Sequence, residues 1–514
     1  MSQSQISVSE ISLHNKDTDC WIVVDGQVWD ITKFAPDHPG GPGIIYKFAG
    51  KDATQVYNGV HAPSILKTNL PKDALKGTLD RSTVTKEWAA PLPEETPKSA
   101  PASSIEKPPL DSIISAHDFE LAAQHSATAK TWAFYSSACN DLITKDLNAM
   151  LFSRVLFRPR VMRRVDQIST RTTILGHDVS FPLMISPAAM ARLIHPDGEL
   201  AIARATKSQS ILQCISNNAS YSVSEIVSQP SVSEYPFVFQ LYVDRQRHKS
   251  EALLRKITSH QNVTGIFVTT DAAAAGKREA DERVKADETI RNPMMTSSAT
   301  NDKKGGGYGR LMGSFIDPNL NWSDIIWLRS QTTLPLILKG IMSADDVRLA
   351  LEHGLDGVVL SNHGGRNLDT SPPALLVLLE IHARFPEIIT QHHPHSTAVR
   401  QRRTRPFSIF VDGGVRRGTD ILKLVCLGAV AAGIGRPALF ATSYGQEGVE
   451  HLIEIFKDEF ETGMRNIGVT SIEQCSPEYV NSGAIDKWVN KRREHPYALS
   501  WVLSGGQVER ENKL

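Results

Sequence analysis

The stretch Gly357–His363, GVVLSNH, is a short apolar run that ends in polar residues. Helix-like segments such as DGELAIARATKSQ and SADDVRLALEHG separate most of the runs of this kind, and alternating strands and helices form a parallel sheet. Eight units predict an α/β fold, a (β/α)8 barrel with its active site at the carboxyl ends of the strands. A doubly wound open sheet is the alternative, but no GxGxxG follows the first run. The other seven runs are PLMISP (182–187), ILQCIS (211–216), FVFQLYV (237–243), GIFVTTD (265–271), PLILKG (335–340), FSIFVDGG (407–414) and AAGIGRP (431–437).

The composition is that of a globular protein, with 41% hydrophobic and 22% charged residues in a chain of 514. Lys+Arg and Asp+Glu both number 56, which disfavours nucleic acid or an acidic membrane as the main partner. The five cysteines form no CxxC pair, as is typical of a reducing compartment. Neither a membrane span nor a signal peptide or presequence is predicted. We therefore expect a soluble intracellular protein of the cytoplasm or the mitochondrial intermembrane space.

Composition also divides the chain into four parts. Residues 6–82 have a mixed pattern typical of a small domain, and residues 111–475 hold the eight runs. Between them, residues 83–110 are rich in Pro, Ser, Glu and Lys and poor in apolar residues, which predicts a flexible, extended linker. Residues 476–514 are less patterned, and we expect a loosely docked C-terminal tail.

Glycine-rich segments follow the last two runs, as DGGVRRG (412–418) and GIGRP (433–437). Glycines let backbone N–H groups approach a phosphate, and barrels often bind phosphate after strands seven and eight. Tight turns with surface arginines are the alternative for either motif alone. Lys339 ends the fifth run, where it is expected to stabilise an anionic cofactor, to form a Schiff base, or to make a plain salt bridge.

Other strand ends carry candidates for acid–base chemistry. His363 is a candidate general base, and Asp271 is a candidate carboxylate that orients it. Arg278 and Arg366 are candidate bidentate ligands of a substrate carboxylate. A base beside such arginines suits proton abstraction from a 2-hydroxy acid, with a phosphate-bearing cofactor as electron acceptor.

Six motifs carry a resemblance to the FMN-dependent 2-hydroxy-acid dehydrogenases and oxidases over residues 111–475. They are FQLYV (239–243), TTDAAAAGKRE (269–279), LILKG (336–340), VVLSNHGGRNLD (358–369), FVDGGVRRGTDILK (410–423) and GIGRP (433–437). The resemblance implies an FMN cofactor, with His363 as the base, Asp271 as its partner, Tyr242 at the substrate hydroxyl, and Arg278 and Arg366 at the substrate carboxylate. It implies that FMN contacts Pro187, Ala188, Ala189, Ser216, Gln240, Thr269, Lys339, Asp412, Gly413, Gly414, Val415, Arg416, Gly435 and Arg436.

Two histidines stand out in the small N-terminal region. His38 in FAPDHPGG (34–41) and His61 in YNGVHAP (57–63) flank a helix-capable segment. Two neutral imidazoles can bind a haem iron from opposite sides, although isolated histidines more often simply lie on the surface or in the core. With the lead-in DCWIVVDGQVWDITKF (19–34), residues 6–82 resemble a cytochrome b5 domain. The resemblance implies an α+β fold and haem b held by His38 and His61.

A cytochrome b5-like domain, a linker and an FMN barrel, in this order, resemble the flavocytochrome b2 family of cytochrome-type L-lactate dehydrogenases. The resemblance implies oxidation of an L-2-hydroxy acid, lactate-sized or larger, with electrons passing through FMN and haem to a cytochrome c-type acceptor. It also implies a homotetramer. The alternatives are an oxidase that uses oxygen and a non-catalytic haem electron-transfer protein.

Three positions depart from the family pattern. Phe134 replaces the first of two adjacent tyrosines and removes a hydroxyl whose hydrogen bond to a charged group is worth about 1.5–3 kcal/mol. Asn218 stands where the family carries leucine or tryptophan, and Ala275 where leucine is usual. These changes predict more room and polarity over the substrate side chain, and hence a substrate larger or more polar than lactate.

Overall fold

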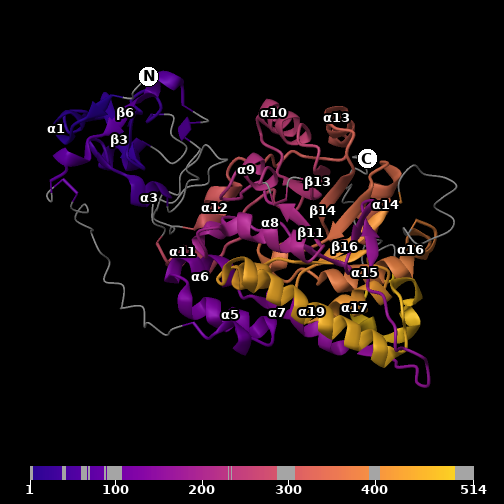
Figure 1. Ribbon diagram of the computed structural model, residues 1–514. Coiled ribbons are helices and arrows are strands. Elements are labelled where there is room, and N and C mark those ends of the chain that lie inside the picture. Colours follow the sequence, from indigo (N-terminus) through magenta and orange to yellow (C-terminus); the bar gives the residue numbers. More distant parts are fainter. Residues whose placement is uncertain are drawn as a thin grey trace.

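The chain forms a small N-terminal domain and a large barrel domain (Figure 1). The structure is a computed structural model, and it describes residues 4–36, 42–58, 66–67, 70–85, 88–89, 107–229, 231–232, 234–285, 307–392 and 406–492. Within these residues, no helix combines the length and the apolar character needed to cross a bilayer.

The N-terminal domain is built on a mixed sheet in the order β1-β6-β4-β3-β2, with β5 paired to β3. The central hairpin turns at Asp25 and Gly26, which both have positive φ, as a two-residue hairpin turn between right-twisted strands requires. Residues of β3 alternate between two apolar clusters, with Ile22 in one and Val23 in the other. The elements are β1 (Gln5–Ile6), α1 (Val8–Ile11), β2 (Asn15–Lys16), β3 (Asp19–Val24), β4 (Gln27–Asp30), α2 (Pro42–Lys47), β5 (Lys51–Asp52), α3 (Thr54–Asn58) and β6 (Leu75–Leu79).

The barrel domain confirms the predicted (β/α)8 fold, because eight parallel strands close on themselves. Each of the eight apolar runs forms one strand. Alternate residues fill the barrel and face the helices: Val359 belongs to the interior cluster, whereas Val358 and Leu360 belong to the outer core. The strands are β10 (Leu183–Ile185), β11 (Leu212–Ile215), β12 (Phe237–Leu241), β13 (Val263–Thr269), β14 (Leu336–Ile341), β15 (Gly357–Leu360), β16 (Ser408–Asp412) and β17 (Ala431–Ile434).

Helices surround this barrel, and in Figure 1 the long α19 runs beside α17 along one side of it. A short hairpin of β8 (Thr172–Ile174) and β9 (His177–Val179) adds Ile174 and Val179 to the interior cluster. The helices are α5 (Ala116–Ser126), α6 (Ala129–Ser136), α7 (Ile143–Met150), α8 (Gly198–Ser208), α9 (Val223–Val227), α10 (Arg247–Thr258), α11 (Glu279–Arg283), α12 (Tyr308–Gly313), α13 (Asp324–Gln331), α14 (Ala344–Glu352), α15 (Ala374–Arg384), α16 (Pro386–His392), α17 (Gly418–Cys426), α18 (Arg436–Thr442) and α19 (Gly445–Ile467).

The two ends of the predicted linker contact the domains that they adjoin. Trp88 donates its indole N–H to the carbonyl of Gly50, 2.9 Å away, and packs on the N-terminal domain. At the other end, Lys107 donates to the carbonyl of Ser443 at 2.6 Å, and Tyr444 donates its hydroxyl to the carbonyl of Pro108 at 2.7 Å. The domain limits taken from composition stay a prediction.

The C-terminal segment differs from the loosely docked tail expected from its weak pattern. In its described part, up to residue 492, β18 (Val480–Asn481) pairs antiparallel with β7 (Leu156–Phe157). Tyr479, Val480 and Ile485 are buried in the barrel core. Three apolar side chains in a two-residue strand and two short 3-10 turns give no periodic pattern, and so the sequence did not reveal this packing.

Candidate active site

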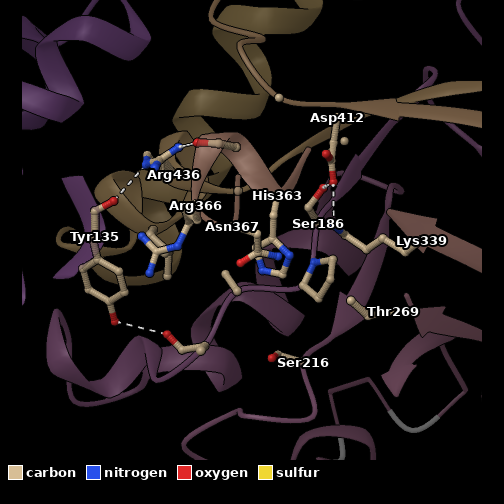
Figure 2. A pocket seen from close by; sticks show the side chains of 18 of the residues that line it. Tyr135, Ser186, Ser216, Thr269, Lys339, His363, Arg366, Asn367, Asp412 and Arg436 are labelled. Atoms are coloured by element: carbon tan, nitrogen blue, oxygen red, sulfur yellow. Dashed lines mark hydrogen bonds and ion pairs between the residues drawn. The ribbon is translucent and has the colours of Figure 1, made fainter. Parts of the chain in front are cut away.

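The polar residues that end the strands meet in one cavity at the carboxyl end of the barrel (Figure 2). Every predicted barrel site residue lines this cavity except Asp271, which lies behind His363 and is hydrogen-bonded to it. The lining residues include Pro187, Ala188, Ala189, Ser216, Gln240, Tyr242, Thr269, Arg278, Lys339, His363, Arg366, Asp412, Gly413, Gly414, Val415, Arg416, Gly435 and Arg436.

His363 and Asp271 form the pair that the sequence predicted. The Nδ1 atom of His363 lies 3.0 Å from Oδ1 of Asp271, and this leaves Nε2 on the side of Tyr242, whose hydroxyl is 3.5 Å away. Burial lowers the pKa of His363, and the charges of Lys339 and Arg278 add to this, whereas Asp271 opposes it. Burial raises the pKa of Asp271, but His363 and Lys339 outweigh burial and lower it. The pair can therefore hold a neutral imidazole beside an ionised carboxylate.

His363 owes its position to an unusual turn after β15. The residues of the 3-10 turn His363–Gly365 all have positive φ, which is uncommon for a histidine. The amide of His363 donates to Oγ of Ser361 at 3.1 Å, and the side chain of Asn362 accepts from the amide of Gly365. The two glycines of SNHGGR therefore permit the turn that directs the imidazole towards Asp271.

Three arginines lie on one side of the cavity: Arg278 is buried, and Arg366 and Arg436 are half-buried. Arg366 donates from Nη1 to the carbonyls of Phe134 (2.8 Å) and Ser137 (3.2 Å). Arg278 donates from Nε to the carbonyl of Arg366, 3.2 Å away, and Arg436 donates from Nη2 to the carbonyl of Ser137 at 2.7 Å. Because neutral carbonyls accept these bonds, the positive charge is not cancelled by them, and the cavity suits anions.

The pKa values of these guanidinium groups reflect the same crowding. Burial lowers the pKa of Arg366 well below its ordinary value, and the positive charges of Arg278 and Arg436 lower it further. Burial also lowers the pKa of Arg436 to about 10. An anion bound between these side chains would relieve their mutual repulsion.

The residues after β16 and β17 fit the phosphate of FMN. Gly413 and Gly414 have φ of 95° and 82°, and a Cβ on Gly414 would lie 2.0 Å from the carbonyl of Asn148, so only glycine is accommodated there. A Cβ on Gly435 would meet no atom within 4 Å, which leaves its backbone open to a ligand. Arg416 lines the same space and forms an ion pair with Glu120 of α5.

Lys339 lies deep in the cavity beside Asp412, as Figure 2 shows. Its Nζ donates to Oγ of Ser361 at 2.9 Å and lies 3.4 Å from Oδ2 of Asp412. Burial lowers the pKa of Lys339, but Asp412, Asp271 and Tyr242 outweigh burial and raise it. A protonated ammonium suits an anionic cofactor and disfavours the Schiff base that the sequence left open.

Gln240 and Thr269 form a polar edge beside Lys339, at the ends of the neighbouring strands β12 and β13. Oε1 of Gln240 accepts from the amide of Asn217 at 3.1 Å, and its Nε2 donates to Oγ1 of Thr269 at 3.0 Å. Ser216 lines the cavity next to them. This arrangement of donors and acceptors fits the polar edge of a flavin ring, and the cavity as a whole fits FMN.

Several lining residues could not be predicted from the sequence. Lys145 and Asn148 come from α7, and Tyr135 comes from α6. Asn148 exchanges amide hydrogen bonds with Asn362 at 2.9 and 2.8 Å. These helices precede the first barrel strand, where no strand end marks the position of a side chain, and so only the tertiary structure brings them to the site.

The three residues that depart from the family pattern, Phe134, Asn218 and Ala275, all line the cavity. The guanidinium of Arg366 lies over the ring of Phe134, 5.0 Å from its centre. The ring of Tyr308 meets Phe134 edge-on at 5.5 Å. Phe134 therefore keeps the packing of an aromatic residue at this position.

The predicted haem ligands His38 and His61 lie outside the described residues. The described residues next to these segments are largely apolar, with Ile45, Ala49, Tyr57 and Leu66 in one cluster. An apolar wall fits the face of a haem.

Comparison with known proteins agrees with this site. Residues 123–482 match the FMN-dependent dehydrogenase family, and residues 7–80 match the cytochrome b5-like heme/steroid binding domain. The chain belongs to the FMN-dependent dehydrogenase family. It is an enzyme of this family with FMN in the barrel and haem b in the N-terminal domain.

Relatives of this FMN-dependent dehydrogenase include both cytochrome-type L-lactate dehydrogenases and glycolate oxidases. The L-lactate dehydrogenase (cytochrome) of Saccharomyces cerevisiae is 38% identical over 490 residues, which cover 94% of this chain and 80% of the relative. The glycolate oxidase of Spinacia oleracea is 34% identical over 374 residues, or 72% of this chain and 95% of the relative. A solved structure of a mutant flavocytochrome b2 with benzoylformate has a TM-score of 0.63 and 35% identity, covering 78% of this chain and 94% of that one.

Proposed function

We propose that this enzyme oxidises an L-2-hydroxy acid to the 2-oxo acid and passes the electrons through haem b to a cytochrome c-type acceptor. The observation that carries the proposal is the His363–Asp271 pair in a cavity that also contains the guanidinium groups of Arg278 and Arg366. A base beside an anion site is what removal of a proton from a 2-hydroxy acid requires. FMN, when bound, accepts the two electrons that leave the substrate.

Each residue then has a separate role. Arg278 and Arg366 bind the substrate carboxylate and orient the substrate. His363 takes the proton at Nε2, and Asp271 stabilises the imidazolium that forms. Burial raises the pKa of Tyr242 to about 12, so its hydroxyl stays protonated and can donate a hydrogen bond to the substrate.

The substrate is proposed to be larger or more polar than lactate. Asn218 and Ala275 both line the cavity, where they offer an amide and a small side chain. One solved structure of a mutant flavocytochrome b2 contains benzoylformate, an aromatic 2-oxo acid, which supports room for a large group in such barrels. Turnover of lactate far faster than any bulkier acid would contradict this part of the proposal.

A spectral titration without oxygen tests the proposal directly. L-lactate and then larger and more polar L-2-hydroxy acids are added while the flavin and haem bands are recorded. Bleaching of the flavin followed by the spectrum of reduced haem is expected, and the acid with the highest kcat/KM defines the substrate class. If no acid bleaches the flavin, the proposal is wrong.

Oxygen as the acceptor is the second candidate, because the glycolate oxidases share the barrel. Peroxide yield in air, compared with the rate of cytochrome c reduction, separates the two acceptors. A homotetramer, in the cytoplasm or the mitochondrial intermembrane space, remains part of the proposal, and mass measurement in solution and cell fractionation test these points.

The proposed base predicts a characteristic pH dependence. Because burial lowers the pKa of His363 below its ordinary value of 6.5, the imidazole is neutral at pH 7. We expect kcat/KM to be flat near neutral pH and to fall only as the pH drops below about 6.5. In Asp271→Asn the acid limb should move to still lower pH, because Asp271 raises the pKa of His363. An acid limb that moves upward would contradict the assignment.

Phe134→Tyr is expected to lower KM for L-lactate by about tenfold or more, because a hydrogen bond to a charged group is worth about 1.5–3 kcal/mol. The ring already lines the cavity beside Arg366, so the new hydroxyl lies close to the proposed carboxylate site. Tyr308→Phe is the matched control, since it removes a hydroxyl from the adjacent ring. Steady-state kinetics measure both, and an unchanged KM in Phe134→Tyr would show that position 134 does not reach the substrate.

A further inference from the structure

Arg192 lies where the N-terminal domain contacts the barrel. It belongs to the 3-10 turn Ala191–Leu193, and its Nη2 donates a hydrogen bond to the carbonyl oxygen of Asn58. Asn58 is the last residue of α3, which lies on the side of the small domain next to the barrel (Figure 1). The last carbonyls of a helix lack partners within the helix, and the helix dipole favours a cation there. A guanidinium from the barrel therefore suits this helix end.

The barrel holds Arg192 in place for this contact. Its amide donates to Oγ of Ser220 at 3.1 Å, and its guanidinium lies over the ring of Tyr221, 5.1 Å from the centre. The buried carboxylate of Glu199 accepts from the amides of Ala191 and Ser220, both at 2.9 Å, and so joins the two turns. A side chain that is already ordered loses little conformational entropy when it binds.

The same segment forms part of the cavity wall. Ala188 and Ala189 line the cavity and precede Arg192 by four and three residues. The hydroxyl of Tyr135, which also lines the cavity, donates to the carbonyl of Met190 at 2.6 Å. On the other side of the contact, Asn58 precedes the predicted haem ligand His61 by three residues. Residues 188–192 therefore extend from the proposed flavin site to a contact with α3, the helix that precedes the predicted haem ligand His61.

We propose that Arg192 is the docking residue that holds α3 against the flavin end of the barrel and thereby sets the rate of electron transfer from FMN to haem. The inference rests on the proposed electron path. Each transfer moves one electron from reduced flavin to ferric haem, which becomes ferrous, and no covalent bond forms or breaks. Arg192 touches neither the substrate nor the reacting atoms, and so it is a positioning residue.

Full-length Arg192→Glu, Arg192→Lys and Arg204→Ala are compared by rapid mixing with substrate in the absence of oxygen. Arg204, on α8, forms an ion pair with Asp197 and is the matched control, since its described bonds lie within the barrel domain. In Arg192→Glu we expect flavin reduction near the wild-type rate and haem reduction slowed by about tenfold or more. Arg192→Lys should retain an intermediate rate, and Arg204→Ala should match the wild type. Haem reduction at the wild-type rate in Arg192→Glu would overturn the inference.

Two further measurements separate this inference from the proposed function. Hydrogen–deuterium exchange in residues 54–58 should become faster in Arg192→Glu and stay unchanged in Arg204→Ala, whatever the substrate is. Photochemical reduction of the flavin allows haem reduction to be followed without substrate. If no 2-hydroxy acid bleaches the flavin but this photoreduced electron transfer still depends on Arg192, the docking inference stands and the proposed function fails. Equal exchange in Arg192→Glu and wild type would mean that Arg192 does not dock α3.

Discussion

Replacing His363 by glutamine is expected to lower kcat by about 10⁴-fold, near the upper end of what a positioned general base contributes. Glutamine keeps a polar side chain on the turn His363–Gly365, but it cannot accept the substrate proton. Stopped-flow reduction of the flavin by saturating substrate measures the effect on chemistry without the later transfer to haem.

The variant Asp271→Asn should show a smaller loss of kcat than His363→Gln and so serves as a comparison. It preserves the shape behind His363 but removes the carboxylate that lies 3.0 Å from Nδ1. Its kcat should fall less than that of His363→Gln, because the base remains. Unchanged FMN content, read from absorbance, shows that both variants fold. A kcat for His363→Gln within tenfold of the wild type would mean that another group takes the proton.

Replacing Arg366 by methionine is expected to lower kcat/KM by about 10²- to 10⁴-fold, because removing one partner of a charge pair that is desolvated when substrate binds costs about 3–5 kcal/mol. Arg278 remains to bind the substrate carboxylate, so binding should weaken rather than vanish. The Kd for pyruvate should rise in parallel, which is measured by flavin absorbance without turnover.

The variant Arg366→Lys separates the effect of the positive charge from that of the guanidinium geometry. Lysine restores the charge but not the planar, two-pronged donor geometry, so its kcat/KM should lie between those of the methionine variant and the wild type. Arg366 also holds the carbonyls of Phe134 and Ser137, and thermal unfolding of each variant must therefore be compared with wild type. If both variants keep the wild-type Kd for pyruvate, Arg366 does not bind the carboxylate.

The barrel could be predicted from the sequence because the same physical constraint acts on every strand. A parallel strand buried on both faces needs an unbroken apolar run, as in β15. The polar residues that follow this run then lie at the carboxyl end of the barrel. His363, Lys339 and Asp412 each follow or end such a run, and the structure brings all three to one cavity. The residue types at these ends were therefore enough to predict where the site lies.

Residues contributed by irregular or preceding segments could not be predicted in this way. Asn148 meets Asn362 across 214 residues of chain, and Glu120 pairs with Arg416 from a helix before the barrel. Such contacts depend on how α5 and α7 pack on the finished barrel, and neither helix carries a pattern that specifies it. The contact of Arg192 with Asn58 joins two domains and leaves no mark on either local sequence.

The anchored ends of the connecting segment determine how the two redox domains meet. Trp88 packs on the N-terminal domain and Lys107 on the barrel, so the covalent connection between these anchors is residues 90–106, a length of chain that spans at most about 60 Å. Two sites joined by a short connection have an effective concentration on the order of millimolar. Haem reduction within one chain should therefore be first order and insensitive to dilution, whereas delivery to a diffusing acceptor should depend on its concentration. The covalent connection thus makes electron transfer from flavin to haem intramolecular. Only the transfer from haem to the acceptor depends on collision between molecules.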